Sequence, residues 1–177
     1  MHIDAIARAA KVRLMIFDVD GVLTDGGLQF GEEGVVIKRF HVHDGLGIRL
    51  LQESGVQTAI ITARQSPIVT RRATDLGIHF VQQGVHNKSD ALNRLLKQTG
   101  LTADVCGFAG DDIIDLPALM RVGFAVSVPN GHPEVKSRVH FVTQDSGGMG
   151  AVRNICDFIL RAQGNYDKAL APYLGNG

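Results

Sequence analysis

Two groups of aspartates stand out in this chain of 177 residues, because each follows a short apolar run of the kind that forms a buried strand. Asp18 and Asp20 follow the run Val12–Phe17. The second group, Gly110–Asp115, follows the run Val105–Ala109. Carboxylates held this close repel one another, and a bound Mg²⁺ relieves the repulsion because hard divalent cations take oxygen ligands. The spacing therefore predicts a magnesium site between two strand exits.

Each aspartate group also has a simpler interpretation. Asp18 and Asp20 could merely start an Asx turn. Asp111 or Asp112 could merely accept the first backbone N–H groups of a helix that contains Leu116. Ligands of open α/β sheets bind outside the carboxyl ends of the strands, so both groups are expected at one edge of the sheet. This shared edge favours the metal interpretation.

Two further strand exits carry groups suited to an anion. Thr62 follows the run Thr58–Ile61, and its hydroxyl can donate to a phosphate oxygen. Lys88 precedes a helical pattern that Ser89 is expected to cap, where the helix N-terminus adds positive potential. An aspartate pair, a threonine, a lysine and a second aspartate group, in that order, predict a site for a phosphate ester.

Short β-branched runs alternate with amphipathic helical patterns along the chain, which predicts an α/β fold with a parallel sheet. Ser66 and Pro67 indicate a helix start, and Gly77 supplies the end of that helix. Gly100 and Gly164 close two later helical patterns in the same way. The predicted strands are Val12–Phe17, Thr58–Ile61, His79–Gln82, Val105–Phe108, Phe124–Val128 and His140–Thr143.

Two segments depart from this alternation. Residues 24–40 contain two β-like runs on either side of Gly31–Gly34, which predicts a β-hairpin that projects from the sheet. Residues 164–177 lack a sustained apolar face, so we expect a flexible C-terminal tail that orders only on a partner. The rest of the chain, residues 1–163, is expected to form a single domain.

Charge and composition limit the partners. The chain has 18 basic and 18 acidic residues and a pI near 7.1, whereas binders of nucleic acids and membrane surfaces normally carry a basic stripe. No apolar run approaches the roughly 18 residues of a membrane span. Cys106 and Cys156 are too few for a disulfide framework. We therefore expect a cytoplasmic protein whose partners are small molecules or copies of itself.

Several segments of the chain form a recognisable set. They are DVDGVLTDG, GLQFGEEGVVIKRF, HVHDGLGIR, IITAR, GVHNK, GDDIIDLPALMRVG and GGMGAVRNICDFILRAQG. Together they resemble a capless subfamily of the haloacid dehalogenase superfamily, the phosphatases of 3-deoxy-D-manno-octulosonate 8-phosphate. The resemblance implies a three-layer Rossmann-like fold without a separate cap domain, and a homotetramer assembled through the hairpin. It also implies Mg²⁺-dependent hydrolysis of this sugar-acid phosphate through an aspartyl-phosphate, in lipopolysaccharide precursor biosynthesis.

The resemblance implies a role for each acidic residue at the strand exits. Asp18 would be the nucleophile, and Asp20 would protonate the leaving sugar oxygen and then deprotonate water. Mg²⁺ would be held by Asp18, the backbone carbonyl of Asp20 and Asp111. Asp112 or Asp115 would act through a water molecule or by orienting the lysine.

The remaining implied roles concern the phosphate and the sugar acid. Thr62 and Lys88 would bind the phosphoryl oxygens. Guanidinium groups are natural bidentate partners of a substrate carboxylate, and some of them would reach across a subunit interface. The implied substrate-binding set also contains Asp20, Asp44, Gly45, Arg49, Arg64 and Arg72.

Two positions depart from the family pattern. Ala63 stands where the family commonly has glycine, and His43 stands where it commonly has arginine. His43 puts the identity of the sugar acid in question, because a histidine is only partly charged near neutral pH. His41, His43 and Asp44 also allow a zinc site, since alternating histidines on a strand share one face. The alternative is that this segment lines the sugar pocket.

Two other functions stay open at this point. One is a phosphatase of a related nonulosonate 9-phosphate, whose family shares these motifs. The other is a non-catalytic phosphosugar-binding protein, which would predict loss of a catalytic group. A phosphomutase would need an inserted cap to exclude water, and the chain has no room for one. Against the non-catalytic alternative, the chain retains Asp18, Asp20, Thr62, Lys88 and Asp111.

Overall fold

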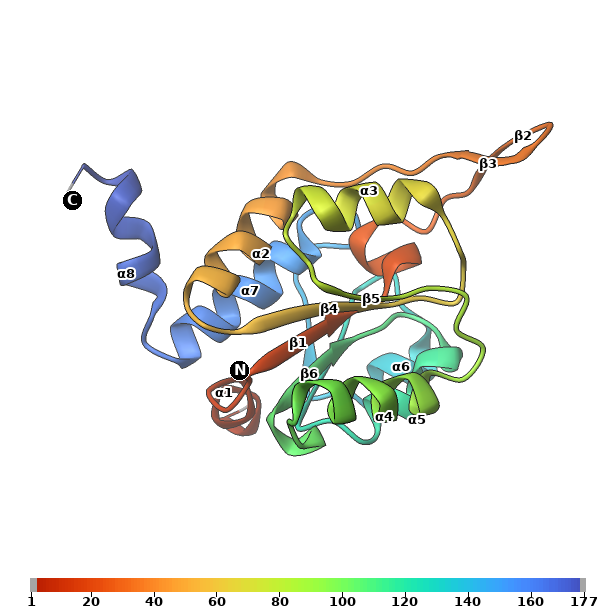
Figure 1. Cartoon of the computed structure of the whole chain (residues 1–177). Coiled ribbons are helices and arrows are strands. Elements are labelled where there is room, and N and C mark those ends of the chain that lie inside the picture. The colour runs from red at the N-terminus through yellow and green to blue at the C-terminus, as the bar shows by residue number, and fades with distance from the viewer. Residues whose placement is uncertain (1–2, 176–177) are drawn as a thin grey trace.

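A six-stranded parallel sheet forms the centre of the molecule, with helices on both faces (Figure 1). The computed structural model describes residues 3–175. The strand order is β5-β4-β1-β6-β7-β8, so the chain builds one half of the sheet from β1 outward and then the other half. The strands are β1 (Leu14–Phe17), β4 (Gln57–Ile61), β5 (Phe80–Gln82), β6 (Cys106–Ala109), β7 (Phe124–Ser127) and β8 (Phe141–Val142).

Alternate side chains of β1 belong to two separate hydrophobic cores, as the two-residue period of a strand requires. Met15 and Phe17 pack in one core, and Leu14 and Ile16 pack in the other. This arrangement confirms the predicted α/β fold with three layers and a parallel sheet. Helices of the first core are α1 (Ile3–Ala9), α2 (Val42–Glu53), α3 (Pro67–Asp75) and α7 (Ala151–Ala162). Helices of the second are α4 (Lys88–Thr99), α5 (Leu116–Leu119) and α6 (Pro133–Lys136).

The predicted hairpin is present and projects well beyond the layers (Figure 1). It consists of β2 (Gln29–Gly31) and β3 (Gly34–Ile37), with Gly31 paired to Gly34 across the turn. Gly34 has φ +117°, a backbone conformation that L side chains rarely adopt. Phe30 and Ile37 on the hairpin are more than half exposed.

Helix α2 begins at Val42, so the interpretation of His41–Asp44 as a strand was wrong. His41 is the N-cap residue of α2, and the helix continues to Glu53. Gly45 and Gly47 weaken the helical pattern of α2, but Gly47 has a packing reason. A Cβ on Gly47 would lie 2.9 Å from Cδ of Arg153, so glycine allows the close approach of α2 and α7.

Helix α4 begins earlier than predicted. The side chain of Asn87, and not that of Ser89, accepts the backbone N–H groups of Ser89 and Asp90 at 3.0 and 3.2 Å. Asn87 is therefore the N-cap, and Lys88 is the first residue of the helix instead of a loop residue. Gly100 ends this helix with φ +69°, as the sequence predicts.

The C-terminal segment contains secondary structure that the sequence analysis did not anticipate. Helix α8 (Tyr166–Leu170) is followed by the 3₁₀ turn Ala171–Tyr173. The guanidinium of Arg161 lies 3.4 Å from the ring centroid of Tyr166 and joins α8 to the end of α7. The flexibility of the tail and its dependence on a partner stay predictions. Among residues 3–175, no helix has the length and apolar character that crossing a membrane requires.

Candidate active site

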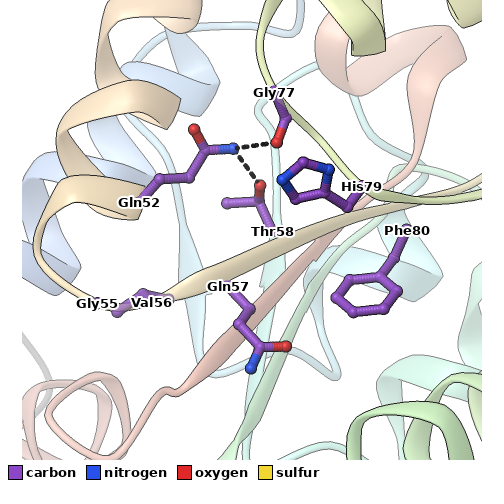
Figure 2. Close-up of a pocket in the computed structure, with 8 residues that line it drawn as sticks. All are labelled: Gln52, Gly55, Val56, Gln57, Thr58, Gly77, His79 and Phe80. Atoms are coloured by element: carbon purple, nitrogen blue, oxygen red, sulfur yellow. Dashed lines mark hydrogen bonds between the residues drawn. The ribbon is translucent and has the colours of Figure 1, made fainter.

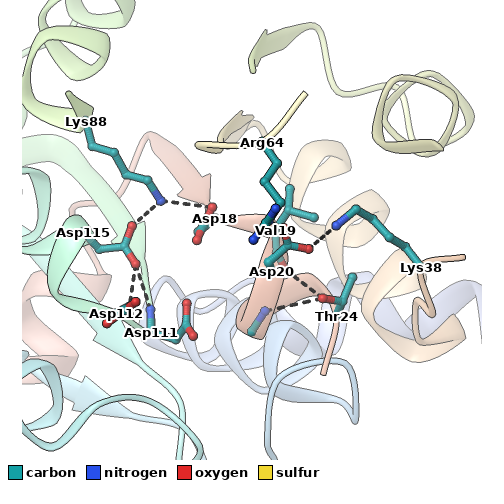
Figure 3. Close-up of polar contacts among 11 residues, drawn as sticks. Asp18, Val19, Asp20, Thr24, Lys38, Arg64, Lys88, Asp111, Asp112 and Asp115 are labelled. Atoms are coloured by element: carbon teal, nitrogen blue, oxygen red, sulfur yellow. Dashed lines mark hydrogen bonds and ion pairs between the residues drawn. The ribbon is translucent and has the colours of Figure 1, made fainter. Parts of the chain in front are cut away.

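Asp18 lies at the exit of the central strand and is almost completely buried. Its backbone N–H donates to the carbonyl of Ala109 at 2.9 Å, so the ladder between β1 and β6 fixes its position. The chain then turns sharply through Val19–Leu23, where Gly21 has φ +94°. Figure 3 shows the Asp18 carboxylate facing the acidic residues that follow β6.

The carboxylate of Asp111 lies directly against the turn that follows Asp18. A Cβ on Gly21 would be 2.1 Å from Oδ2 of Asp111, so only glycine allows this approach. Asp18 and Asp111 thus come together from adjacent strand ends, as the two apolar runs of the sequence predict.

Asp115 and Lys88 complete a buried cluster around Asp18 (Figure 3). The Lys88 side chain is 1% exposed, and its Nζ lies 3.0 Å from Oδ1 of Asp18 and in direct contact with Oδ1 of Asp115. Oδ2 of Asp115 accepts the backbone N–H groups of Asp111 and Asp112 at 3.0 and 3.1 Å. Asp115 therefore orients Lys88 and also shapes the loop that carries Asp111.

Carboxylate oxygens of Asp18, Asp111 and Asp115 lie within 4.8 Å of one another. A set of hard anionic oxygens fits Mg²⁺, which favours carboxylate ligands. Oδ1 of Asp18 is buried and accepts no hydrogen bond from the described residues, although Lys88 forms an ion pair with it. This oxygen therefore retains lone pairs for a cation or for an electrophile.

Burial and mutual repulsion perturb the acidity of the cluster. Burial raises the pKa of Asp18 to about 6, although Lys88 opposes the effect. Burial, together with the charges of Asp18 and Asp115, raises the pKa of Asp111 to about 7. Burial alone would lower the pKa of Lys88, but the two adjacent carboxylates outweigh burial and raise it. The three acids repel one another enough to favour a cation among them.

Asp20 faces the solvent side of the site and is held by two cations. Lys38, at the base of the hairpin, contacts its Oδ1, and Nε of Arg64 lies 3.4 Å from its Oδ2. Asp20 and Arg64 line an open pocket of about 310 Å³. The remaining lining residues are Asp18, Gly26, Leu28, Thr62, Ala63, Asp111, Asp112 and Ile114.

Thr62 lies buried at the exit of β4, on the same edge of the sheet as Asp18. Its backbone N–H donates to the carbonyl of Gln82 at 3.0 Å, and its carbonyl accepts from Val85 at 3.1 Å. These two hydrogen bonds fix the loop that follows β4. Thr62, Ala63 and Arg64 of this loop line the pocket on the side opposite Asp111.

Four of the predicted substrate residues lie elsewhere and do not line this pocket. Buried Asp44 accepts the backbone N–H of Arg153 at 2.8 Å, which ties α2 to the first turn of α7. A Cβ on Gly45 would lie 2.6 Å from a guanidinium nitrogen of Arg72. Arg49 donates to the carbonyl of Asp75 at 3.0 Å. Substrate contacts by these four residues stay predictions.

The zinc interpretation finds no support in the geometry of the described residues. The rings of His41 and His43 meet edge to face, with centroids 4.8 Å apart. In residues 3–175, the set of potential ligand atoms close enough to share a metal ion is that of Asp18, Asp111 and Asp115. Asp112 is exposed and caps the short turn Ile113–Asp115 by accepting the N–H of Ile113 at 2.7 Å.

Two residues at the site were missed by the sequence analysis. Lys38 contacts Asp20 from the hairpin, and Asn130 lies in the loop after β7. Nδ2 of Asn130 donates to the carbonyl of Gly21 at 3.1 Å, and its Oδ1 accepts the N–H of Gly147 at 2.8 Å. A lone lysine and a lone asparagine carry no spacing signal, so only the fold reveals these contacts.

A second pocket, of about 260 Å³, lies at the opposite, amino edge of the sheet (Figure 2). Its lining contains amides, backbone and apolar groups, with His79 as the one titratable side chain. Gln52 already donates to Oγ1 of Thr58 at 2.7 Å and to the carbonyl of Gly77 at 3.4 Å. Of these two pockets, the one beside Asp18 carries the groups that are suited to chemistry.

Comparisons with known proteins agree with this geometry. Residues 78–155 match the family model of haloacid dehalogenase-like hydrolases. The 3-deoxy-D-manno-octulosonate 8-phosphate phosphatase KdsC of Escherichia coli strain K12 is 43% identical over 166 residues, which are 94% of this chain and 88% of that protein. The chain belongs to the 3-deoxy-D-manno-octulosonate 8-phosphate phosphatase family.

Crystal structures of this phosphatase family have the same fold. The Moraxella catarrhalis phosphatase, in complex with magnesium, phosphate and 3-deoxy-D-manno-octulosonate (KDO), has a TM-score of 0.94 and 42% identity, covering 97% of this chain and 99% of its own. The cobalt-bound Haemophilus influenzae phosphatase has a TM-score of 0.88 and 43% identity, covering 90% and 93%. Members of the family thus hold a divalent cation and a phosphate, the ligands that the residues around Asp18 suit.

Proposed function

We propose that this chain is a Mg²⁺-dependent phosphatase that hydrolyses 3-deoxy-D-manno-octulosonate 8-phosphate to the free sugar acid and inorganic phosphate. The convergence of Asp18 with Lys88, Asp111 and Asp115 at one sheet edge carries the proposal. An anionic nucleophile and an anionic ester can meet there when Lys88 and a cation bound among the carboxylates offset the negative charge.

In the first step, Asp18 attacks phosphorus with a carboxylate oxygen. The P–O bond to the sugar breaks, and an aspartyl-phosphate forms on Asp18. Asp20, which faces the pocket two residues further along, gives its proton to the departing sugar oxygen. Lys88 and Thr62 bind the non-bridging phosphoryl oxygens, and Lys88 is already oriented by Asp115.

In the second step, water attacks the aspartyl-phosphate, and Asp20 takes the proton that the water loses. A P–O bond forms to the water oxygen and the P–O bond to Asp18 breaks, which releases inorganic phosphate and restores the Asp18 carboxylate. Asp18, Asp111 and the backbone carbonyl of Asp20, with Asp115 beside them, would hold Mg²⁺, which would supply charge neutralisation for both attacks.

We further propose that the sugar end of the substrate is bound by Arg64, which lines the pocket, with additional contacts from Asp44, Gly45, Arg49 and Arg72. Guanidinium groups suit the carboxylate of a sugar acid. Arg49 and Arg72 lie away from the pocket within one chain, which is compatible with a site completed by a neighbouring subunit.

The exposed hairpin supports an oligomer, which we propose to be a homotetramer. A two-stranded hairpin of this kind is marginally stable in isolation, and its exposed Phe30 and Ile37 offer apolar area for a second copy. We also propose residues 1–163 as the hydrolase domain, residues 164–177 as a mobile tail, and a cytoplasmic location.

The decisive experiment is phosphate release by the purified chain with Mg²⁺ and with EDTA. We expect chelator-sensitive release from 3-deoxy-D-manno-octulosonate 8-phosphate, with lower kcat/KM for a nonulosonate 9-phosphate and a hexose phosphate. Preference for the nonulosonate would change the substrate and keep the residue roles. Absence of hydrolysis from every ester with Mg²⁺ present would refute the phosphatase and favour phosphosugar binding alone.

A further inference from the structure

Lys38 differs from its neighbours on the hairpin stem. The stem residue before it, Ile37, is 52% exposed, and the side chain of Arg39 after it is 63% exposed. The Lys38 side chain is only 1% exposed and reaches inward from the base of β3 to Oδ1 of Asp20 (Figure 3). Burying the ammonium group of a lysine is unfavourable unless its charge is paired. The buried position of Lys38 therefore depends on its ion pair with Asp20.

The two cations at Asp20 have different constraints. Arg64 is about half exposed, at 52%, and lies 3.4 Å from Oδ2, so solvent screens it and its side chain can move. Lys38 approaches the other oxygen from a buried position. Of the two, Lys38 is the contact that fixes the direction in which the carboxyl group points.

We infer that Lys38 is a positioning residue for Asp20, so that the base of the hairpin determines where the acid–base carboxyl group lies. This inference rests on the proposed function. General acid catalysis needs the proton within hydrogen-bond reach of the leaving oxygen, so a misdirected Asp20 costs rate even when the nucleophile is intact. Among the described residues, Lys38 pairs with Asp20 and not with Asp18, which pairs with Lys88.

The test compares two substrates that differ in their need for an acid. An alkyl phosphate such as the sugar ester requires protonation of its leaving oxygen, whereas p-nitrophenolate leaves without it. For Lys38→Met we expect kcat/KM to fall about tenfold or more for the sugar phosphate and less than about threefold for p-nitrophenyl phosphate. The ratio kcat/KM reports the steps through formation of the aspartyl-phosphate, so the later attack of water does not obscure the comparison.

Matched variants separate positioning from general damage. Arg39→Met removes the adjacent exposed cation, which pairs with Asp25 at 2.6 Å, and should leave both substrates within about twofold of wild type. Lys38→Arg keeps the positive charge. It should restore most of the kcat/KM for the sugar phosphate, relative to p-nitrophenyl phosphate, that Lys38→Met loses. An equal loss on both substrates in Lys38→Met, or no recovery in Lys38→Arg, would overturn the positioning role.

A readout without turnover distinguishes failure of this inference from failure of the proposed function. The ¹³C carboxyl resonance of Asp20, assigned with Asp20→Asn, should shift in Lys38→Met while that of Asp18 stays in place. An unchanged Asp20 resonance would overturn the inference whatever the enzyme hydrolyses. If Lys38→Met does not fold, Lys38→Gln and Lys38→Arg give the same two measurements.

Discussion

Two lysine–aspartate pairs lie side by side in this site, and they are built differently. Lys88 begins helix α4 and meets Asp18 at the end of the central strand, where both are buried. Lys38 comes from the projecting hairpin and meets Asp20, which is 20% exposed. The first pair belongs to the rigid sheet edge, and the second joins that edge to an element outside the layers (Figure 1).

In the proposed mechanism, the two pairs separate two chemical tasks. The nucleophile must be held against phosphorus with little freedom, and a strand end buried on both sides gives that constraint. The acid–base group must meet different partners in the two steps, a sugar oxygen and then water. A carboxyl group at the pocket wall, held by a side chain from a separate hairpin, suits this second task.

The largest expected effect is that of Asp18→Asn, which removes the proposed nucleophile and leaves Asp20 and its lysine intact. We expect turnover to fall by at least about 10³-fold, because the amide cannot form the aspartyl-phosphate. Circular dichroism should show an unchanged fold. Quench-flow detection of phosphorylated protein in this variant would show that the two pairs do not divide the tasks as stated.

Next in size is the effect of Lys88→Met on stability. Asp18 and Asp115 would be left buried without their cation, so the free energy of unfolding at pH 7 should drop by about 3 kcal/mol. Lys38→Met should cost less, since solvent reaches Asp20. Urea unfolding of both variants measures the difference. Equal losses would contradict the distinction between a buried and a partly solvated pair.

The acid cluster around Asp18 should also make stability and metal binding depend on pH. The pKa values of about 6 for Asp18 and about 7 for Asp111 exceed the ordinary 3.8, so the folded protein keeps protons that the unfolded chain releases between about pH 4 and 7. The metal-free protein should therefore lose stability as pH rises through this window.

Mg²⁺ competes with those protons, so its affinity should rise over the same window and its binding should release protons. Calorimetry in buffers of different ionisation enthalpy measures the proton count, and thermal unfolding with and without Mg²⁺ measures the stabilisation. Flat stability of the metal-free protein between pH 4 and 7 would show that burial of these acids is less complete than in the structure.

The smallest expected effect concerns Asn130, which supports the turn that follows the two proposed catalytic aspartates, Asp18 and Asp20. Asn130→Ala removes a donor to the carbonyl of Gly21 and an acceptor for the N–H of Gly147, worth about 1 kcal/mol each. We expect a several-fold weaker affinity for Mg²⁺. Asn130→Asp keeps the acceptor but not the donor, so it should fall between alanine and wild type. Unchanged Mg²⁺ affinity in both variants would show that the loop containing Asn130 does not support the site.

The sequence predicted the site residues that lie at strand exits. It did not predict contacts that depend on how distant elements pack against one another. Asp18 and Asp111 could be paired in advance, since parallel strands end at one edge. Lys38 could not be paired with Asp20 in advance, because the direction of a hairpin relative to the sheet leaves no local sequence pattern. Helix α2 was not predicted for a related reason. Gly47 lowers the helix propensity of this segment, and its role is to allow the close approach of α7.

The cap of α4 shows the same limit at smaller scale. Asn87 and Ser89 are both good N-cap residues, and local sequence does not choose between them. The choice decides whether Lys88 is free in a loop or is fixed in the first helical turn, and hence how firmly it meets Asp18.

The strand order determines the stage of folding at which the site can form. β1 pairs with β6 from Leu14 and Cys106 to Phe17 and Ala109, although these strands lie far apart along the chain. Closing so long a loop is slow, because chain entropy is lost before the pairing compensates. A nascent chain therefore carries Asp18 long before it carries Asp111 and Asp115, the acids that would hold a cation beside it. Mg²⁺ binding would report that the central sheet has closed, which makes the ion a marker of completed folding as well as a participant in catalysis.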